Sequence, residues 1–459
     1  MVCRRRQEAS RATRGHRRDA HVTPTTGRSS LVQHPGAARA RRPPPSTCPR
    51  RPPAPAPWKT VHLTSDGPPP RPPAPRASAT PAVAALGRVH GVVLAGSYYW
   101  GEGAFEQLLR GPLLPVAQRP VICFPLGWLR AGGVSDATIC ANGSTPMVER
   151  ALGDGTRLGM ALSYHMDEQP RGPAGCARDA AAAAPASTYV LVEGAMIPSL
   201  DLRGLLAAHR RAGAAATTVV EIDRRRAAVG GARRAAPGGI YVLERRVLES
   251  VPATGFQDIK QGLLERLYAA GERVHVHEVH GIAPRILDYH SYAGVSGWLI
   301  ATAARRAEFR DWVPMGEGLR HPTAEVDPSV RVVGPALLGP HVRVGAGAVL
   351  VGPVSVGAHS VIEPQALVAR SSVWERCVVG AGAVVDASLL AHAVVVPPGA
   401  RVMGAVEVVD GAGLVADVLA PTAEPWPALE PVRVPVDFSL LHGLLAPDGM
   451  GDDLPRVPA

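Results

Sequence analysis

The sequence predicts an α/β protein: a doubly wound, Rossmann-like domain followed by a left-handed parallel β-helix. Short apolar runs that alternate with segments of helical leucine spacing predict the first part, and a six-residue repeat predicts the second. With 459 residues, 46% of them apolar, the chain can support two or three domains. We expect four segments: a disordered tail (1–87), an α/β domain (88–310), a β-helix (320–410) and an extended C-terminal strap (411–459).

The N-terminal segment is rich in arginine and proline, in runs such as "RPPAPAP" and "PPPRPPAPR". It can bury too little apolar surface to offset the entropy lost on ordering, so we expect disorder. Residues 1–87 hold 16 Lys or Arg against three acids, so they account for the net charge of +10 and the rest of the chain is mildly acidic. Three origins fit this composition: an upstream extension from a misplaced start codon, a natural disordered tail, or an organellar transit segment.

Strands alternate with helices from residue 88 onward. Three short runs rich in apolar and β-branched residues are predicted as strands: 91–96, 188–194 and 238–244. Between and after them, 201–213 and 257–271 carry leucines at helical spacing and end in glycine, with Asp201 and Asp258 placed as N-caps. This order is typical of a sheet covered by helices on both faces.

A strict six-residue repeat begins after residue 320. Apolar residues recur at Val326, Val332, Leu338, Val344, Leu350, Val356, Ile362, Val368 and Trp374, after which the spacing slips by one at Val379 and Val385. Hexads of this kind build the flat sides of a parallel β-helix with about 18 residues per coil. The repeat therefore predicts roughly four and a half coils.

Composition excludes several classes of function. The six cysteines form no CxxC pair, so the sequence indicates neither a zinc site nor a disulfide framework, and a reducing cytoplasm is expected. No apolar run of about 18 residues lies outside the predicted strands, so we expect no membrane span. No basic stripe with interleaved aromatics follows residue 88, so nucleic acid is not an expected partner.

The architecture and several motifs resemble the sugar-phosphate nucleotidyltransferases, or NDP-sugar pyrophosphorylases, including mannose-1-phosphate guanylyltransferases. "PLLPVAQRPVI" (112–122) is similar to the family's P-L-x-P-V-x-x-x-P-L-I, "YVLVEGAMIPSLDL" (189–202) to V-x-x-G-D-x-x-x-x-x-D-L, and "GGIY" (238–241) to A-G-I-Y. The resemblance implies a reaction in which a sugar-1-phosphate oxygen attacks the α-phosphorus of a nucleoside triphosphate. That chemistry needs phosphate-binding cations and Mg²⁺ held by carboxylates.

The positions that this resemblance makes catalytic lack the expected charges. The lysine of the family's P-K-P-L corresponds to Gly111, and the two metal-binding aspartates correspond to Ala195 and Arg285. A methyl group cannot bind magnesium, and a guanidinium repels it. Arg110, Glu193 and Asp288 are the neighbouring groups that could compensate.

The phosphate-binding loop also departs from the family. It matches the glycine-rich pattern at Gly96 and continues with Ser97, which makes these two residues candidate nucleotide contacts. Tyr98, Tyr99 and Trp100 then fill the loop with rings. They either stack on a ligand or fill an abandoned pocket.

Residues 171–175, "RGPAG", align with the family's base-contacting loop. Gly172, Ala174 and Gly175 are therefore candidate nucleotide contacts. Pro173 replaces a threonine and has no N–H to donate. The alternative is that the segment forms only a tight turn.

The β-helix allows a different enzyme class, because some hexapeptide proteins are acyltransferases that use a histidine as general base. His341 and His359 lie 18 residues apart and are expected to stack on successive coils, and His392 is a third candidate. No acidic residue is evidently placed to orient them.

These departures predict a protein of NDP-sugar metabolism with a decayed active site, acting as a regulatory or scaffolding subunit that binds a nucleotide or nucleotide sugar weakly. It would assemble through the β-helix, with itself or with an active homologue, and no metal or cofactor is expected. The alternatives are an active, Mg²⁺-dependent transferase that uses Arg110, Glu193 and Asp288 to make an NDP-sugar such as GDP-mannose or an NDP-glucose, and a hexapeptide acyltransferase.

Overall fold

The structure is a computed structural model that describes residues 87–96, 112–167, 169–222, 235–280 and 283–408. The predicted strap (411–459) and all but the last residue of the predicted tail (1–87) lie outside these residues. The described residues all belong to one compact unit, so the contacts below are contacts within that unit.

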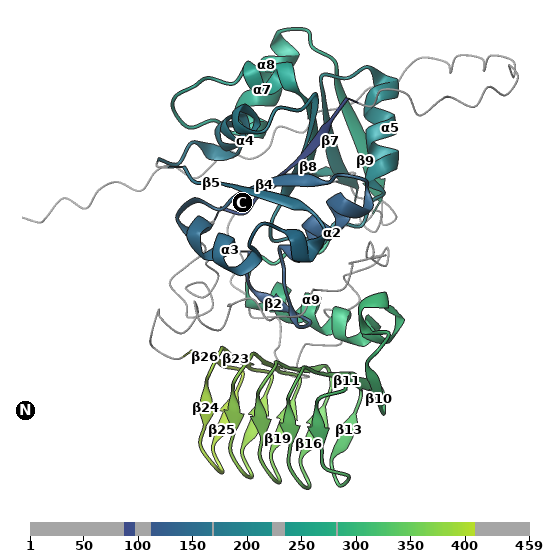
Figure 1. Cartoon of the computed structure of the whole chain (residues 1–459), viewed down its shortest axis with the longest axis vertical. Helices are drawn as coiled ribbons and strands as arrows, with labels where there is room; N and C mark the ends of the chain where they lie inside the picture. The colour runs from purple at the N-terminus through teal and green to yellow at the C-terminus, as the bar shows by residue number, and fades with distance from the viewer. Residues whose placement is uncertain (1–86, 97–111, 168, 223–234, 281–282, 409–459) are drawn as a thin grey trace, which may run out of the picture. The chain divides into compact units, whose positions relative to one another are not determined.

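A seven-stranded sheet forms the centre of the α/β region, with strand order β5-β4-β1-β6-β8-β7-β9 (Figure 1). Its strands are β1 (Val89–Leu94), β4 (Asp136–Cys140), β5 (Ala161–His165), β6 (Thr188–Glu193), β7 (Ala216–Ile222), β8 (Ala235–Glu244) and β9 (Val274–His280). The three predicted strands are confirmed as β1, β6 and β8. β8 runs antiparallel to both neighbours, so the sheet is mixed.

Helices cover both faces of this sheet, as the sequence predicts. Alternate residues of one strand face opposite layers: Val93 packs with the layer that holds α2 and α5, and Val92 packs with the layer that holds α4, α7 and α8. The helices are α2 (Cys123–Ala131), α3 (Thr145–Leu152), α4 (Gly172–Ala183), α5 (Leu202–Ala212), α7 (Arg245–Glu249), α8 (Leu264–Ala269) and α9 (Tyr289–Thr302). Short turns are η1 (Asn142–Ser144), η2 (Thr156–Leu158), η4 (Ala303–Arg305) and η5 (Ala307–Phe309).

Both predicted N-caps are confirmed. The Asp201 carboxylate accepts hydrogen bonds from the backbone N–H groups of Arg203 and Gly204 at the start of α5. The Asp258 carboxylate accepts from Lys260 and Gln261, but the element it caps is a π-helical turn, η3 (Ile259–Leu263), which α8 then continues. These acids satisfy backbone donors and are not free for catalysis.

The predicted β-helix is confirmed: its coils stack, and their short strands form three sheets, one along each side (Figure 1). One face holds β11 (Gly318–Arg320), β14 (Ala336–Leu338), β17 (Val354–Val356), β20 (Ser372–Val373), β23 (Leu389–Leu390) and β26 (Val406–Glu407), with β10 (Val313–Met315) antiparallel to β11 at its edge. The second face holds β12 (Glu325–Val326), β15 (Arg343–Val344), β18 (Val361–Ile362), β21 (Val378–Val379) and β24 (Val395–Val396). The third holds β13 (Arg331–Val333), β16 (Val349–Val351), β19 (Leu367–Ala369), β22 (Val384–Asp386) and β25 (Arg401–Met403).

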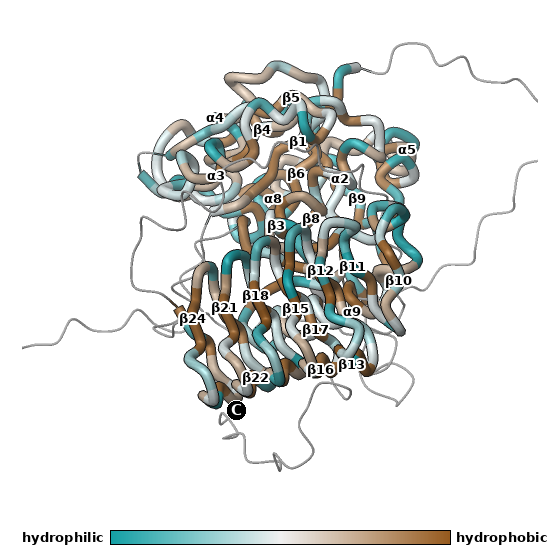
Figure 2. The backbone as a smooth tube through the Cα atoms, turned by 60° about the horizontal axis from the view of Figure 1, so that its bottom comes forward, coloured by the Kyte–Doolittle hydropathy of each residue, from teal (hydrophilic) through white to brown (hydrophobic). Residues whose placement is uncertain are grey.

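Apolar residues stack in register inside the coils. Val326 pairs with Val344 and Val344 with Ile362, which gives the predicted 18-residue coil. Figure 2 shows hydrophobic stretches repeating along the coil strands, separated by more hydrophilic turns. Burial of these residues stabilises the stack at about 25 cal/mol per Å² of apolar surface removed from water.

The predicted position of the register slip was wrong by one hexad. Val356 pairs with Val373, so the coil shortens to 17 residues before Trp374, not after it. The reason is local: the earlier coils turn through Gly-Pro at 334–335 and 352–353, whereas the next turn, "VARSSV", is one residue shorter. Trp374 therefore lies one residue past the paired position, where its indole meets α9.

The α/β region and the β-helix share one apolar core through α9 and the hairpin β2 (Pro115–Val116) and β3 (Arg119–Pro120). The Tyr292 hydroxyl of α9 donates to the Pro115 carbonyl at 2.8 Å and accepts from the Trp374 indole N–H at 2.9 Å. Gln118 donates to the Ser355 hydroxyl at 2.8 Å and the Val356 carbonyl at 2.9 Å. Side-chain hydrogen bonds thus connect the two regions.

Candidate functional site

The carboxyl ends of the central strands form the edge at which an open α/β sheet binds ligands. Gly96 follows β1 there, and a Cβ at Gly96 would lie 2.8 Å from the side-chain nitrogen of Asn142. A Cβ at Gly194 would lie 2.9 Å from the Cβ of Ala95. Close packing thus accounts for both glycines, and a phosphate contact by Gly96 stays a prediction. Ser97 lies outside the described residues, as do Tyr98, Tyr99 and Trp100.

The structure brings together Ala195 and Arg285, the two positions that the resemblance predicts to correspond to metal-binding aspartates. Met196 forms an isolated antiparallel bridge with Arg285, and the Ile286 N–H donates to the Ala195 carbonyl at 3.0 Å. The segments after β6 and before α9 therefore lie side by side, as a shared metal site requires. The side chains that they offer are a methyl group and a guanidinium.

The Arg285 guanidinium lies between two carboxylates. Its Nε is 3.1 Å from Glu193 Oε2 and its Nη1 is 3.0 Å from Glu221 Oε2, while Nη2 donates to the Pro237 carbonyl at 3.3 Å. The side chain of Glu221 is 3% exposed and that of Arg285 is 16% exposed. Burial lowers the pKa of Arg285, but the charges of Glu221 and Glu193 outweigh that effect and hold the pKa above its usual value.

The backbone makes room for this ion cluster. Gly239 of β8 lies opposite the end of β6 with a φ of +67°, and a Cβ there would come within 2.5 Å of the Glu193 carboxyl carbon. Glu221 also accepts a hydrogen bond from the Ala283 N–H at 3.1 Å. β6, β8 and β7 are neighbours in the sheet, so three strands and the segment before α9 hold one arginine.

These residues do not fit a divalent cation. A magnesium ion needs several oxygen ligands free of other cations. Ala195 offers no side-chain ligand, and the two carboxylates that do converge, Glu193 and Glu221, are both ion-paired with Arg285. The guanidinium therefore occupies the space between the carboxylates that a cation would need.

The proposed compensating groups have other partners or lie outside the described residues. Asp288 caps α9: its carboxylate accepts from the Ser291 N–H at 2.7 Å, and the Ser291 hydroxyl completes a capping box. Glu193 is paired with Arg285. Arg110 and Gly111 lie outside the described residues.

Arg171 is the N-cap residue of α4, and residues 172–175 form the first turn of that helix. Gly172 has a φ of +74°, and a Cβ there would lie 2.6 Å from the Gln257 carbonyl oxygen. That same oxygen accepts the Ala174 N–H at 3.0 Å. Gly175 packs close to the Arg171 side chain. The alternative of a mere tight turn was therefore wrong, because these residues begin a helix. The Ala174 N–H is already used within the protein, and nucleotide contact by Gly172, Ala174 and Gly175 stays a prediction.

His341 and His359 of the β-helix stack as predicted. Among the described residues, no acidic side chain is hydrogen-bonded to the rings of His341, His359 or His392. The rings of His341 and His359 are 4.9 Å apart and nearly parallel. His392 lies 4.9 Å from the Trp374 ring, is 7% exposed, and its Nδ1 has no hydrogen-bond partner among the described residues. Burial, and secondarily Arg376, lowers the pKa of His392 to about 4. General-base catalysis by a triad-like pair is therefore unsupported.

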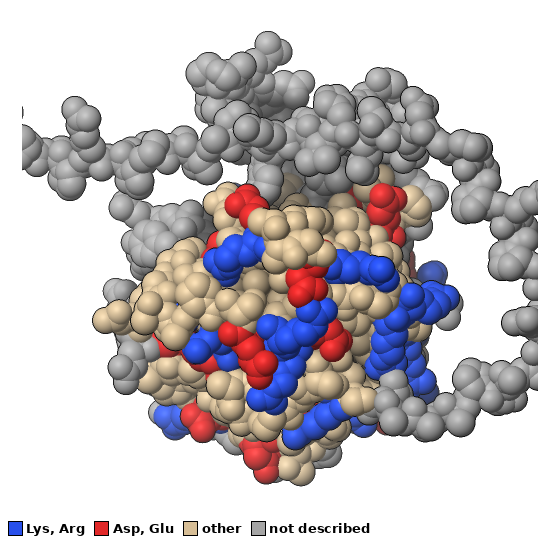
Figure 3. All heavy atoms as spheres, turned by 90° about the horizontal axis from the view of Figure 1, so that it is seen from above, with Lys and Arg blue, Asp and Glu red and all other residues tan. Residues whose placement is uncertain are grey.

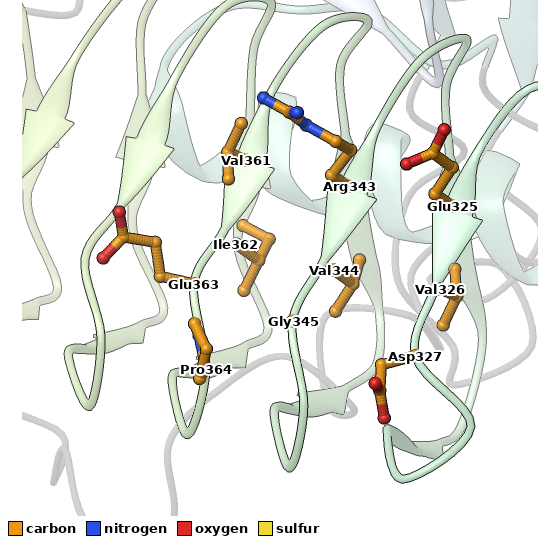
Figure 4. Close-up of a pocket in the computed structure, with 10 residues that line it drawn as sticks. All are labelled: Glu325, Val326, Asp327, Arg343, Val344, Gly345, Val361, Ile362, Glu363 and Pro364. Atoms are coloured by element: carbon orange, nitrogen blue, oxygen red, sulfur yellow. The ribbon is translucent and has the colours of Figure 1, made fainter.

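Two surface depressions have linings of different character. One, of about 450 Å³, lies on the face formed by β12, β15 and β18, where Figure 4 shows Arg343 on the strand between those of Glu325 and Val361. Its other charged lining residues are Asp327 and Glu363, so acids outnumber the single arginine, which disfavours a triphosphate. The other, of about 560 Å³, lies beside the start of α4, between residues 169–171 and 253–256.

Surface charge is mixed on the face drawn in Figure 3, where acidic and basic side chains lie among one another. No helix of the described residues is both long and apolar enough to cross a bilayer.

Sequence reasoning missed Glu221 and Gly239. The available signal was an acid inside the apolar run "TTVVEI", because a carboxylate on a buried strand requires a partner. The partner was Arg285, which is 64 residues away and enters only through the tertiary fold.

Comparison with known proteins supports the resemblance to nucleotidyltransferases. Residues 107–249 match the family model of nucleotidyl transferases. A glucose-1-phosphate thymidylyltransferase of Streptomyces griseus is 38% identical over 64 residues, covering 14% of this chain and 18% of the relative. A mannose-1-phosphate guanylyltransferase of Mycobacterium tuberculosis (strain ATCC 25618 / H37Rv) is 28% identical over 99 residues, covering 22% of this chain and 28% of the relative.

Among solved structures, a provisionally described glucose-1-phosphate thymidylyltransferase of Bacillus anthracis aligns with 46% of this chain and 94% of its own, at 19% identity and a TM-score of 0.40. The matched stretches span less than a third of the curated relatives' length. The family match falls within the α/β region. The α/β region of this chain is therefore similar to sugar-phosphate nucleotidyltransferases, and its residues 107–249 match the nucleotidyl transferase family model.

Proposed function

We propose that this chain is a regulatory or scaffolding subunit of NDP-sugar metabolism whose own transferase site has decayed. The observation that carries the proposal is the Arg285 guanidinium bound between Glu193 and Glu221, beside Ala195. Losing a metal ligand or a phosphate cation from a site of this kind typically costs a factor of about 10² to 10³ or more in rate, and here several such groups are replaced together.

The same geometry weighs against the active alternative. Catalysis by relocated groups would require Glu193 to leave Arg285 and Asp288 to leave the N-terminus of α9. The first change breaks the ion pair between Glu193 and Arg285, and the second removes an N-cap that stabilises a helix by about 1 kcal/mol. Both costs would recur in every catalytic cycle.

The remaining elements fit a binding and assembly role. A nucleotide or nucleotide sugar is the ligand that the family's cleft would take weakly, and the flat faces of the β-helix are suited to contact a second copy or an active homologue. The four described cysteines are free thiols, which agrees with a cytoplasmic location.

A pyrophosphate-release screen tests the proposal directly. The full chain is incubated with Mg²⁺, each of four nucleoside triphosphates, and glucose-1-phosphate or mannose-1-phosphate, beside an active thymidylyltransferase as positive control. We expect no release above the chelated blank, but thermal stabilisation by at least one nucleotide or nucleotide sugar, or a changed kcat/KM of an active homologue mixed with this chain.

Release that disappears with chelator, and again in Glu193→Gln, would contradict the proposal and favour the relocated-group enzyme. Neither release, nor ligand stabilisation, nor an effect on a homologue would contradict the regulatory role and leave a structural protein.

A further inference from the structure

A second group of polar side chains lies at another part of the same sheet edge, where β4 and β5 end and α4 begins. Cys140 is the last residue of β4 and pairs in register with His165, the last residue of β5. Asp167 follows two residues later, and Cys176 comes from α4. Three neighbouring elements therefore bring two thiols, an imidazole and a carboxylate to one place.

The distances suit a shared ligand. His165 Nε2 lies 2.9 Å from Asp167 Oδ1, and one ligand atom each of His165, Asp167 and Cys176 all lie within 4.8 Å of one another. The Cys140 thiol is hydrogen-bonded to the Cys176 thiol, so it lies next to this group but outside the set of mutually close ligand atoms. In the described residues, His165, Asp167 and Cys176 are the one cluster of at least three such ligand atoms at this spacing.

The environment resembles that of a closed metal site. The Asp167 side chain is 3% exposed, Cys176 is 5% exposed and Cys140 is 2% exposed, while His165 keeps 26% of its side chain in solvent. Both cysteines are free thiols, and the ion-pair partner of Asp167 is His165. Unlike the Glu193 and Glu221 pair, this cluster has no guanidinium among the ion pairs of its carboxylate.

We propose that His165, Asp167 and Cys176 bind one zinc-type ion, and that the adjacent Cys140 thiol turns toward the ion as its fourth ligand. Four ligands of sulfur, nitrogen and oxygen type match the tetrahedral preference of Zn²⁺, and with all four from the protein the ion would be a structural one. Binding replaces the hydrogen bonds within the cluster and exchanges two thiol protons for Zn²⁺, so protons are released and the ligands are two thiolates, neutral imidazole and carboxylate.

This site would fix the start of α4, which holds residues 172–175, to the ends of β4 and β5. The resemblance aligns residues 171–175 with a base-contacting loop, so an ion here would stabilise the fold beside that position. The proposal does not rest on the proposed function, since a silent subunit and an active transferase could both carry such an ion.

Cobalt substitution tests the site, because Co²⁺ bound by thiolates gives a near-ultraviolet charge-transfer band and strong tetrahedral d–d absorption. The full chain, purified with reductant and stripped of metal, is titrated with CoCl₂ and then with ZnCl₂. We expect one Co²⁺ per chain with the thiolate band, displacement by an equal amount of Zn²⁺, and a higher melting temperature with Zn²⁺.

Variants locate the ion. Cys140→Ser, Cys176→Ser and His165→Ala should each weaken Co²⁺ binding at least tenfold, and the two serine variants should reduce the thiolate band. Cys123→Ser and Cys377→Ser, at two other buried free thiols, are the matched controls and should leave the band unchanged. Far-ultraviolet circular dichroism of each metal-free variant checks that it folds.

Absence of a thiolate band in the wild-type chain would overturn the proposal, whether or not any variant folds. A band that persists when Cys140 and Cys176 are both serine would also overturn it, because the thiolates would then come from other cysteines. A Zn²⁺-induced melting shift that is equal in wild type and in the folded His165→Ala variant would count against His165 as a ligand and overturn the four-ligand site.

Discussion

The α/β region and the β-helix treat buried polar groups differently. In the α/β region, buried polar side chains pair with other side chains: Glu221 pairs with Arg285, and His209 pairs with Glu244. In the β-helix, backbone groups of neighbouring coils are the main partners: the Ser360 hydroxyl donates to the Trp374 carbonyl at 2.8 Å and accepts the Cys377 N–H at 3.0 Å.

This difference has a functional consequence. A site built from side-chain charges can change its chemistry through one substitution, as the guanidinium at position 285 illustrates. A coil held by backbone ladders keeps its shape when side chains change, so it is suited to persist as an assembly element while the cleft loses its activity.

Removing the buried cation should give the largest effect. Arg285→Ala leaves the Glu221 carboxylate buried and unpaired, so we expect a loss of about 3 to 5 kcal/mol in the free energy of unfolding, measured by urea denaturation. Arg203→Ala, on the exposed side of α5, is the control and should change it by less than about 0.5 kcal/mol. Adding Glu221→Gln to Arg285→Ala should recover part of the loss.

A loss below about 1 kcal/mol in Arg285→Ala would show that the two carboxylates do not depend on the guanidinium. The contrast between the two regions would then fail at its strongest point.

The β-helix should instead lose stability on acidification through His392. The native pKa of about 4 lies below the ordinary value of 6.5, so the unfolded chain binds a proton that the native coil does not as the pH falls through this window. Relative to His392→Phe, the wild type should therefore lose about 3 kcal/mol between pH 7 and pH 4. Comparing the two proteins cancels the opposite contribution of nearby Glu375, whose pKa burial raises to about 7.

Parallel pH profiles for wild type and His392→Phe would mean that the ring is hydrated or paired in solution. Chemical denaturation at several pH values distinguishes these outcomes.

Gly239 tests how tightly the strands enclose the Arg285 cluster. Gly239→Ala meets both a positive φ and the Glu193 carboxylate, so we expect a loss of about 2 kcal/mol. Gly271→Ala has nearly the same φ, +71°, with nothing within 4 Å, and should lose only about 1 kcal/mol. Equal losses would mean that Glu193 moves freely; thermal melts of both variants measure the difference.

The smallest expected effect is at the connection between the regions. Tyr292→Phe removes the hydroxyl that donates to the Pro115 carbonyl and accepts from the Trp374 indole, and it should lower the free energy of unfolding by about 1 kcal/mol. Tyr268→Phe, at a side chain that is 57% exposed, should cost nothing measurable in the same thermal melt. If both variants melt alike, the hydrogen bonds through Tyr292 do not contribute to joining α9 and the β-helix.

Periodic features were predictable from the sequence because they repeat locally. The hexads gave the coils, and Asp201 and Asp258 gave the helix starts. The resemblance also identified Ala195 and Arg285 as corresponding positions, and the structure brings them together. The slip before Trp374 was missed because a turn shortened by one residue leaves both neighbouring apolar spacings plausible.

Partners across the fold were not predictable. The sequence around Glu221 gives no indication that Arg285 is its partner. The spacing of Cys140 and Cys176 resembles no metal motif, because the two thiols come together only when α4 packs against β4. Which side chain pairs with a buried charge in this domain is therefore decided by tertiary contacts.

Crystals grown with MnCl₂ and a nucleoside triphosphate test the central claim most directly, since manganese substitutes for magnesium and scatters anomalously. The account predicts the Arg285 guanidinium between Glu193 and Glu221, with no anomalous peak at these carboxylates. A manganese ion within about 2.5 Å of both carboxylates, with Arg285 turned away, would contradict it.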